Sequence, residues 1–201
     1  MHNRRTFLKT SGHLLIGFSI IESPFRPRKV KSGTAGSGLV RATAGENAID
    51  SWIRVDANGY VTVLTGKMEL GQGVKTALMQ IAAEELDVNM NRVRIITADT
   101  GQTPNERYTA GSASIESSGR SIRNAAAEAR RKLLEMAEKK LQVPVSDLAI
   151  ENGIIQSKGK KQGVSYWELL EGKHIEGEVT GKAPLKDPST YKLVGSAVPR
   201  E

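Results

Sequence analysis

The chain has 201 residues, no cysteine and a formal net charge of +7 at pH 7. The lack of cysteine excludes disulfides, thiolate nucleophiles and cysteine-held zinc or iron–sulfur centres on this chain. The charge does not indicate a nucleic-acid-binding protein, because residues 1–50 carry +5 of it and the other 151 residues only +2. Aromatic residues, which stack on bases, are also scarce.

The first fifty residues predict an export leader followed by a flexible linker. Arg4-Arg5-Thr6-Phe7-Leu8-Lys9 precedes an apolar run at residues 14–21, which is shorter than the about 20 residues of a membrane-spanning helix. This pattern is typical of an export leader, and the arginine pair resembles the twin-arginine signal. The alternative is a disordered basic tail with a chance apolar patch. Residues 22–50 are rich in Gly, Ser, Pro and Lys and predict a linker. We therefore expect a periplasmic or otherwise exported protein.

The next segment predicts a hairpin, a helix and a third strand. Residues 52–56 and 60–64 flank Asn58-Gly59, a strong hairpin signal. A glycine-rich loop at residues 66–73 follows, and apolar residues then recur at helical spacing from Val74 to Leu86. Residues 93–97 predict the third strand.

A polar loop at residues 99–112 leads into a long predicted helix that Pro144 ends. Its expected buried stripe is Ile122, Ala125, Ala126, Ala129, Leu133, Met136, Ala137 and Leu141. Residues 148–151 and 154–156 flank Asn152-Gly153 and predict a second hairpin. Ser165 and Glu168 have the spacing of a capping box, so a short helix begins there, and Gly172 can end it.

The predicted order is β-β-α-β-α-β-β-α, an α+β fold with a small mixed sheet of hairpins and two main helices. We assign residues 51–180 to this domain. Residues 181–201 show little periodicity and are expected to be a linker toward a further domain.

Two loops of small residues, each before a helix, are candidate ligand sites. Gly71, Gln72 and Gly73 can let a ligand approach the backbone, the helix start offers N–H groups to an anion, and Gln72 can donate and accept. The alternative is an ordinary strand-to-helix turn. The second loop contains Ala110, Gly111, Ser112 and Ser114, of which the serines could instead cap the helix. The loops should converge if both helices pack on one face of the sheet.

The remaining polar residues predict neither a catalytic group nor a metal site. The three histidines are scattered along the sequence. Glu84, Glu85, Glu116 and Glu128 are expected on solvated helix faces. Arg107 and Tyr108 are candidates for exposed contact with a substrate or partner.

Taken together, these motifs resemble the molybdopterin-binding subunit of the xanthine dehydrogenase family, in particular the isoquinoline 1-oxidoreductase type of large subunit. The resemblance extends over roughly residues 52–156. The matching residues are Gly66-Lys67-Met68-Glu69-Leu70-Gly71-Gln72-Gly73, Thr76, Ala83-Glu84-Glu85-Leu86, Asp99-Thr100, Pro104-Asn105 and Thr109-Ala110-Gly111-Ser112-Ala113-Ser114.

The resemblance implies a molybdenum hydroxylase, which hydroxylates N-heteroaromatic rings or oxidises aldehydes with oxygen from water. It implies molybdopterin, in the free or cytosine dinucleotide form, bound only together with the rest of the large subunit. The contact residues carried over are Gly71, Gln72, Gly73, Ala110, Gly111, Ser112 and Ser114. Large subunits of the family are several times longer, and their general base lies beyond the matched region, so no catalytic residue is assigned here. The expected partners are the remainder of the large subunit, an iron–sulfur small subunit and a small heterocycle or aldehyde.

Two functional hypotheses follow from the sequence. The first is an enzyme component that is inactive alone. The second is a non-catalytic relic or interaction module that binds no cofactor.

Overall fold

The computed structural model describes residues 47–110, 113–158 and 163–200. The leader and most of the linker predicted over residues 1–50, together with Gly111 and Ser112, lie outside the described residues. Within the described part, none of the helices is long and apolar enough to cross a membrane.

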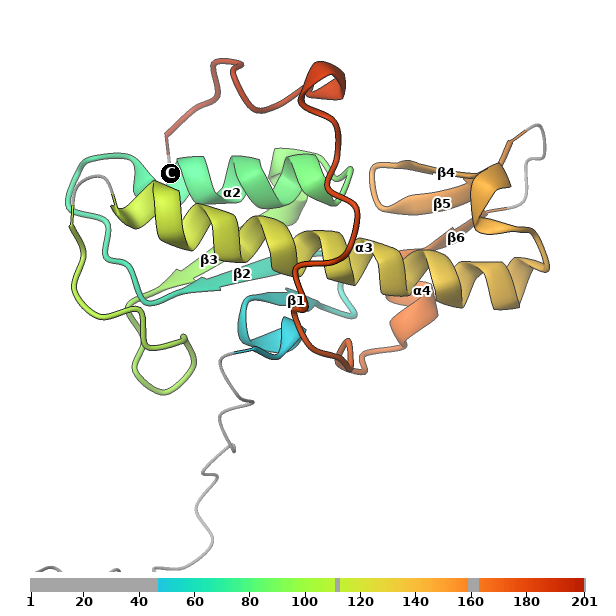
Figure 1. Ribbon diagram of the computed structural model, residues 1–201, viewed down its shortest axis with the longest axis horizontal. Coiled ribbons are helices and arrows are strands. Elements are labelled where there is room, and N and C mark those ends of the chain that lie inside the picture. Colours follow the sequence, from blue (N-terminus) through green and yellow to red (C-terminus); the bar gives the residue numbers. More distant parts are fainter. Residues whose placement is uncertain (1–46, 111–112, 159–162, 201) are drawn as a thin grey trace, which may run out of the picture. The chain divides into compact units, whose positions relative to one another are not determined.

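The first sheet is mixed and has three strands in the order β1-β2-β3 (Figure 1). Strands β1 (Ile53–Val55) and β2 (Val61–Thr65) pair antiparallel across the Asn58-Gly59 turn, where Gly59 takes a positive φ of 88°. Strand β3 (Val93–Thr97) pairs parallel with β2. Since parallel neighbours need a crossover, helix α2 (Val74–Glu85) connects them.

The long helix α3 (Arg120–Leu141) packs beside α2 (Figure 1), and a π-helical turn, η3 (Ser114–Gly119), precedes it. Both helices begin at the same end of the described domain. Close approach is possible because Gly119 faces α2, where a Cβ would stand 2.9 Å from the Ile81 side chain. Gly119 therefore lets the turn before α3 pack closely against the middle of α2.

A second, antiparallel sheet follows, with β4 (Leu148–Glu151), β5 (Ile154–Ser157) and β6 (Gly163–Ser165). Helix α4 (Tyr166–Leu170) begins at the predicted capping box. Buried side chains of both sheets join one core, and the Tyr166 hydroxyl donates to the Leu86 carbonyl over 2.8 Å. Short 3-10 turns η1 (Ile49–Ser51), η2 (Met90–Arg92), η4 (Val145–Asp147) and η5 (Pro188–Thr190) complete the elements.

The α+β prediction is confirmed, with two refinements. The single predicted sheet is two sheets of three strands each. The strand β6 was missed because three residues, only two of them buried, are too few to show an alternating pattern.

Residues 186–200 lie against the helices and run antiparallel to α2 (Figure 1). Near the end of α2, the Glu84 carboxylate accepts from three amides of this segment. One turn earlier, Gln80 donates to the carbonyls of Leu193 and Ser196. At the beginning of α2, the Arg200 guanidinium donates to the Gly71 carbonyl. This segment thus covers the length of α2.

Candidate functional site

The two predicted loops lie side by side and are joined by direct hydrogen bonds. The Met68 amide donates to the Thr109 hydroxyl over 2.8 Å. The ammonium of Lys67, only 3% exposed, donates to the carbonyls of Glu106 (2.7 Å) and Tyr108 (3.1 Å). A buried charge needs such partners, so Lys67 ties the first loop to the second.

The Glu106 carboxylate makes a second link at the end of β2. It accepts from the Gly66 amide over 2.7 Å and from the Thr65 hydroxyl over 2.5 Å. Gly66 is required here, because a Cβ would stand 2.5 Å from the Pro104 carbonyl oxygen. The glycine therefore allows the two loops to approach within hydrogen-bond distance.

The Gly71–Gly73 turn is held from inside by Glu69. Its carboxylate accepts from the amides of Gly71 (2.8 Å), Gly73 (2.9 Å) and Lys75 (3.0 Å). These hydrogen bonds, that of Gly73 foremost, lower the pKa of Glu69 below its usual value. The sequence predicts that the helix start offers N–H groups to an external anion; the structure gives these three to Glu69.

Gln72 lies exposed on this turn and closes it from outside. Its Oε1 accepts from the Leu70 amide over 2.6 Å, and its Nε2 donates to the Met68 carbonyl over 3.0 Å. Gly71 takes a φ of 94°, and nothing lies within 4 Å of the point where its Cβ would stand. The Gly71 amide and carbonyl already bind Glu69 and Arg200, so what lies open at Gly71 is the Cα face of the main chain.

In the second loop, the structure describes Ala110 and Ser114 of the four candidates. Ser114 is buried, and its hydroxyl donates to the Ala110 carbonyl over 2.8 Å. It does not cap the helix as the alternative expected, because a cap accepts from a backbone amide and no side-chain cap forms at the start of η3 or of α3. Of the buried polar side chains described, the Ser118 hydroxyl, in the same π-helical turn, has no hydrogen-bond partner. Such turns interrupt helices at functional sites in many proteins.

Several large apolar side chains are exposed around these loops: Met68 (51%), Leu70 (69%), Tyr108 (79%) and Ile115 (43%). Single exposed apolar residues are ordinary, but a gathering at one end marks a contact surface. Among the described residues, no cluster of His, Cys, Asp or Glu could hold a metal ion.

The acidic residues predicted on solvated faces are instead mostly buried, so that prediction is wrong for Glu84, Glu85 and Glu128. Glu116 is exposed, as expected. The Glu128 carboxylate accepts from Arg131 over 3.0 Å and from the Thr180 hydroxyl. The sequence held a signal for Glu85, which falls three residues after the buried Ala82 on the apolar stripe of α2.

Glu84 binds the C-terminal segment. Its Oε2 accepts from the amides of Lys192 (2.8 Å), Leu193 (2.6 Å) and Val194 (3.0 Å), and its Oε1 from the Lys186 ammonium (2.8 Å). Burial opposes ionisation, but Lys186 and the three amides outweigh it and lower the pKa of Glu84 to about 2. The carboxylate is therefore a charged structural anchor.

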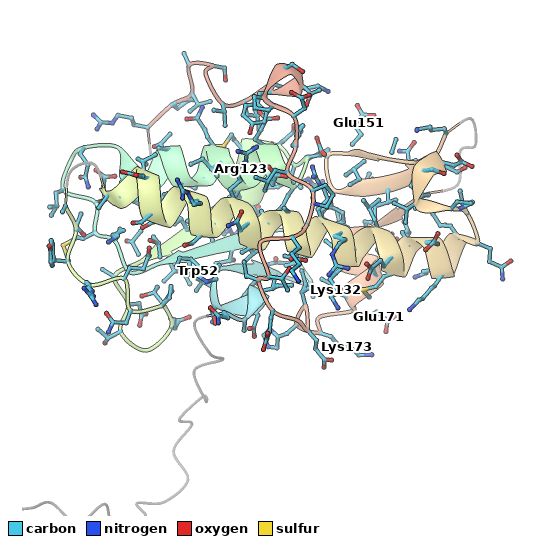
Figure 2. The ribbon with its side chains drawn as sticks, viewed as in Figure 1. Trp52, Arg123, Lys132, Glu151, Glu171 and Lys173 are labelled. Carbon is cyan, nitrogen blue, oxygen red and sulfur yellow. The ribbon has the colours of Figure 1, made fainter. Side chains whose placement is uncertain are left out.

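Glu85 binds two arginines of α3. Its carboxylate lies 3.2 Å from Arg123 Nε and 3.0 Å from Arg130 Nη2, and it accepts from the Lys186 amide over 2.8 Å. Figure 2 shows Arg123 on α3 beside the C-terminal segment. The buried Glu85 carboxylate thus fastens α2, α3 and the C-terminal segment together.

The comparisons with known proteins identify the family. The model of the molybdopterin cofactor-binding domain matches residues 24–197. The chain is 39% identical over 170 residues to the B component of nicotinate dehydrogenase from Pseudomonas putida, covering 84% of this chain and 14% of that protein. It is 27% identical to the beta component of isoquinoline 1-oxidoreductase from Brevundimonas diminuta, over 82% of this chain and 27% of that protein.

Two solved structures share the fold. Reconstituted CO dehydrogenase from Oligotropha carboxidovorans superposes with a TM-score of 0.52 at 28% identity, covering 59% of this chain and 15% of that one. Quinoline 2-oxidoreductase from Pseudomonas putida 86 gives a TM-score of 0.50 at 31% identity, over 58% and 15%. The chain thus spans a minor part of each relative. Because the family model matches most of the sequence, both loops included, the chain belongs to the molybdopterin cofactor-binding domains of the xanthine dehydrogenase family.

Proposed function

We propose that this chain forms one wall of the molybdopterin site in the large subunit of a molybdenum hydroxylase. The proposed contact residues are Gly71, Gln72, Gly73, Ala110, Gly111, Ser112 and Ser114. The observation that carries the proposal is the set of hydrogen bonds from Lys67 and Met68 to the second loop. Those bonds join the first loop, just before Gly71–Gly73, to residues 106–109, just before the described Ala110.

The residues present fit such a group as a wall of main chain. A Cβ at Gly71 would meet nothing within 4 Å, so a flat ligand can approach the backbone there. Gln72 keeps hydrogen-bonding capacity, because a carboxamide has two donor hydrogens and two acceptor lone pairs and each of its ends makes one hydrogen bond in the loop. The exposed Met68 and Leu70 add apolar surface beside it.

When bound, the cofactor supplies the oxidation chemistry, with water as the source of oxygen, and this chain's residues bind and orient it. The substrate we propose is an N-heteroaromatic ring or an aldehyde. Relatives named for nicotinate, isoquinoline and aldehydes support this class. We assign no general base to this chain, and we expect it to be inactive alone.

We propose two protein partners, the remainder of the large subunit and an iron–sulfur small subunit. Support comes from three relatives whose own names make each of them one subunit of an enzyme. The proposed cofactor is molybdopterin, free or as the cytosine dinucleotide. The alternative, a non-catalytic interaction module, would keep the partners and lack the cofactor.

Metal and pterin analysis tests the proposal. The chain is purified with its co-purifying proteins, and molybdenum and pterin are measured in each fraction. We expect both wherever the chain is joined by the rest of the large subunit, with hydroxylase activity only there. A complete complex without pterin would favour the interaction module. Turnover of a heterocycle or aldehyde by the partner-free chain would refute the expected inactivity.

We also propose export by the twin-arginine route, on the sequence of residues 1–21 alone. A reporter fused to this leader should be exported, and lysine at both Arg4 and Arg5 should abolish export. Undiminished export of the double variant through that route would contradict the proposal.

A further inference from the structure

The Gly71–Gly73 turn has an internal carboxylate bound where a ligand anion would bind. Glu69 lies two residues before the first glycine, and its side chain folds forward along the loop. Oε1 accepts from the amides of Gly71 and Gly73, and Oε2 from the amide of Lys75. Both oxygens are therefore engaged by main-chain donors at the beginning of α2.

These donors are the groups that bind phosphates in many proteins. The first N–H groups of a helix lack partners within the helix and carry a partial positive charge. In this chain, Glu69 supplies the negative charge instead. A second anion at the same amides would have to displace this carboxylate or lie against it, which like-charge repulsion opposes.

The same contacts fix the loop's backbone. Gly71 and Gly73 take φ values of 94° and 82°, which glycine adopts freely. Glu69 holds both residues in this conformation by accepting hydrogen bonds from their amides. Gln72 closes the other side through Met68 and Leu70. The loop is thus fixed from within, while its outer surface at Gly71 stays open.

We propose that Glu69 is the positioning residue of this loop, which fixes the Gly71–Gly73 backbone for the cofactor and closes the beginning of α2 to anionic groups. The part of the cofactor that faces this loop is then a neutral hydrogen-bonding edge, such as the pterin ring, and its phosphate binds elsewhere. The cofactor half of this inference rests on the proposed function. The main-chain hydrogen bonds and the neighbouring positive charge of Arg200 lower the pKa of Glu69 below its ordinary value.

Amide hydrogen exchange of the full 201-residue chain, without cofactor, tests the positioning role. In Glu69→Ala, the amides of Gly71, Gly73 and Lys75 should exchange about tenfold faster or more, because each loses a charge-assisted hydrogen bond. In Glu69→Gln, the exchange of the Lys75 amide should change most, since the glutamine Oε1 can still accept from the amides of Gly71 and Gly73. Glu151→Gln is the matched control, an exposed glutamate on β4 (Figure 2). Unchanged exchange in Glu69→Ala would overturn the proposal.

Titration with inorganic phosphate at constant ionic strength tests the exclusion of anions. The three amide signals should stay fixed in the wild type and shift saturably in Glu69→Ala. A saturable shift in the wild type, or none in the variant, would overturn this half. Neither experiment contains the cofactor, so their failure would leave the wall proposal intact. Conversely, if the complete complex contained no pterin, the wall proposal would fail, but the results of these two experiments would still stand.

Discussion

The two ends of α2 use opposite chemistry. At the beginning of the helix, small residues and exposed apolar side chains surround Glu69, which is bonded only within its own loop and by main-chain amides of α2's first turn. At the end, Glu84 and Glu85 are buried and bind arginines, a lysine and the amides of a segment a hundred residues away. The first end leaves the Cα face of Gly71 uncovered, and the other end is engaged in holding the chain together.

The difference shows which residues of a family motif serve the fold. Both Glu84-Glu85 and Gly71-Gln72-Gly73 belong to the matched pattern. The glutamates carry charge, yet their contacts are internal. The glycines carry no functional group, yet they leave main chain exposed at the proposed site. In this domain, ligand contact is expected from the residues with the least side chain.

The largest effect should come from the engaged end. Glu85→Ala leaves Arg130, whose side chain is 14% exposed, without its carboxylate, so unfolding free energy should fall by about 3–5 kcal/mol. Urea denaturation of the purified chain measures it. Glu151→Gln should change it by less than about 0.5 kcal/mol. A loss below about 1 kcal/mol for Glu85→Ala would show that the network contributes little to stability.

The anchor at Glu84 should make stability depend on acid. Its pKa is about 2 in the folded chain, below its ordinary 4.5. The folded state therefore binds this proton less readily, so the carboxylate's contribution is complete above about pH 5 and is lost as pH falls toward 2. The expected loss is about 3 kcal/mol. Unfolding measured from pH 5 to 2 should show a weaker pH dependence in Glu84→Gln. Equal slopes in both proteins would contradict the anchor.

Two glycines separate structural from ligand-contact roles within the open end. Gly66→Ala sets a Cβ 2.5 Å from the Pro104 carbonyl and should cost about 1–3 kcal/mol by forcing the loops apart. The Cβ of Gly71→Ala would meet no atom within 4 Å. Only the positive φ at this position is unfavourable for alanine, and it should lower the unfolding free energy by about 1 kcal/mol. In the assembled complex, Gly71→Ala should still lose cofactor, because the added methyl group would occupy space that we propose the cofactor fills. Full cofactor retention by Gly71→Ala would remove Gly71 from the proposed wall.

Local signals predicted the fold well where one short pattern fixes it. Asn58-Gly59, Asn152-Gly153 and the Ser165–Glu168 capping box each depend on residues within four positions, and each forms as predicted. The burial of Glu84 depends on residues 192–194, far along the chain, and no local pattern shows that. The convergence of the two loops was expected on the condition that both helices pack on one face of the sheet, whereas the hydrogen bonding of Gln72 within its own turn was not predictable.

The smallest effect on folding is expected from Gln72→Ala. The side chain is exposed and makes two hydrogen bonds within its own turn, so its removal should lower unfolding free energy by about 1 kcal/mol. In a complex that binds molybdopterin, the same change should reduce cofactor retention, measured as pterin and molybdenum per chain after gel filtration. Gln102→Ala, another exposed loop glutamine, which bonds to Asp99, is the matched control and should retain the cofactor. Loss of retention in both variants would point to general loosening of the loops. Unfolding of Gln72→Ala would make this residue structural, and the open end of α2 would then resemble the engaged one.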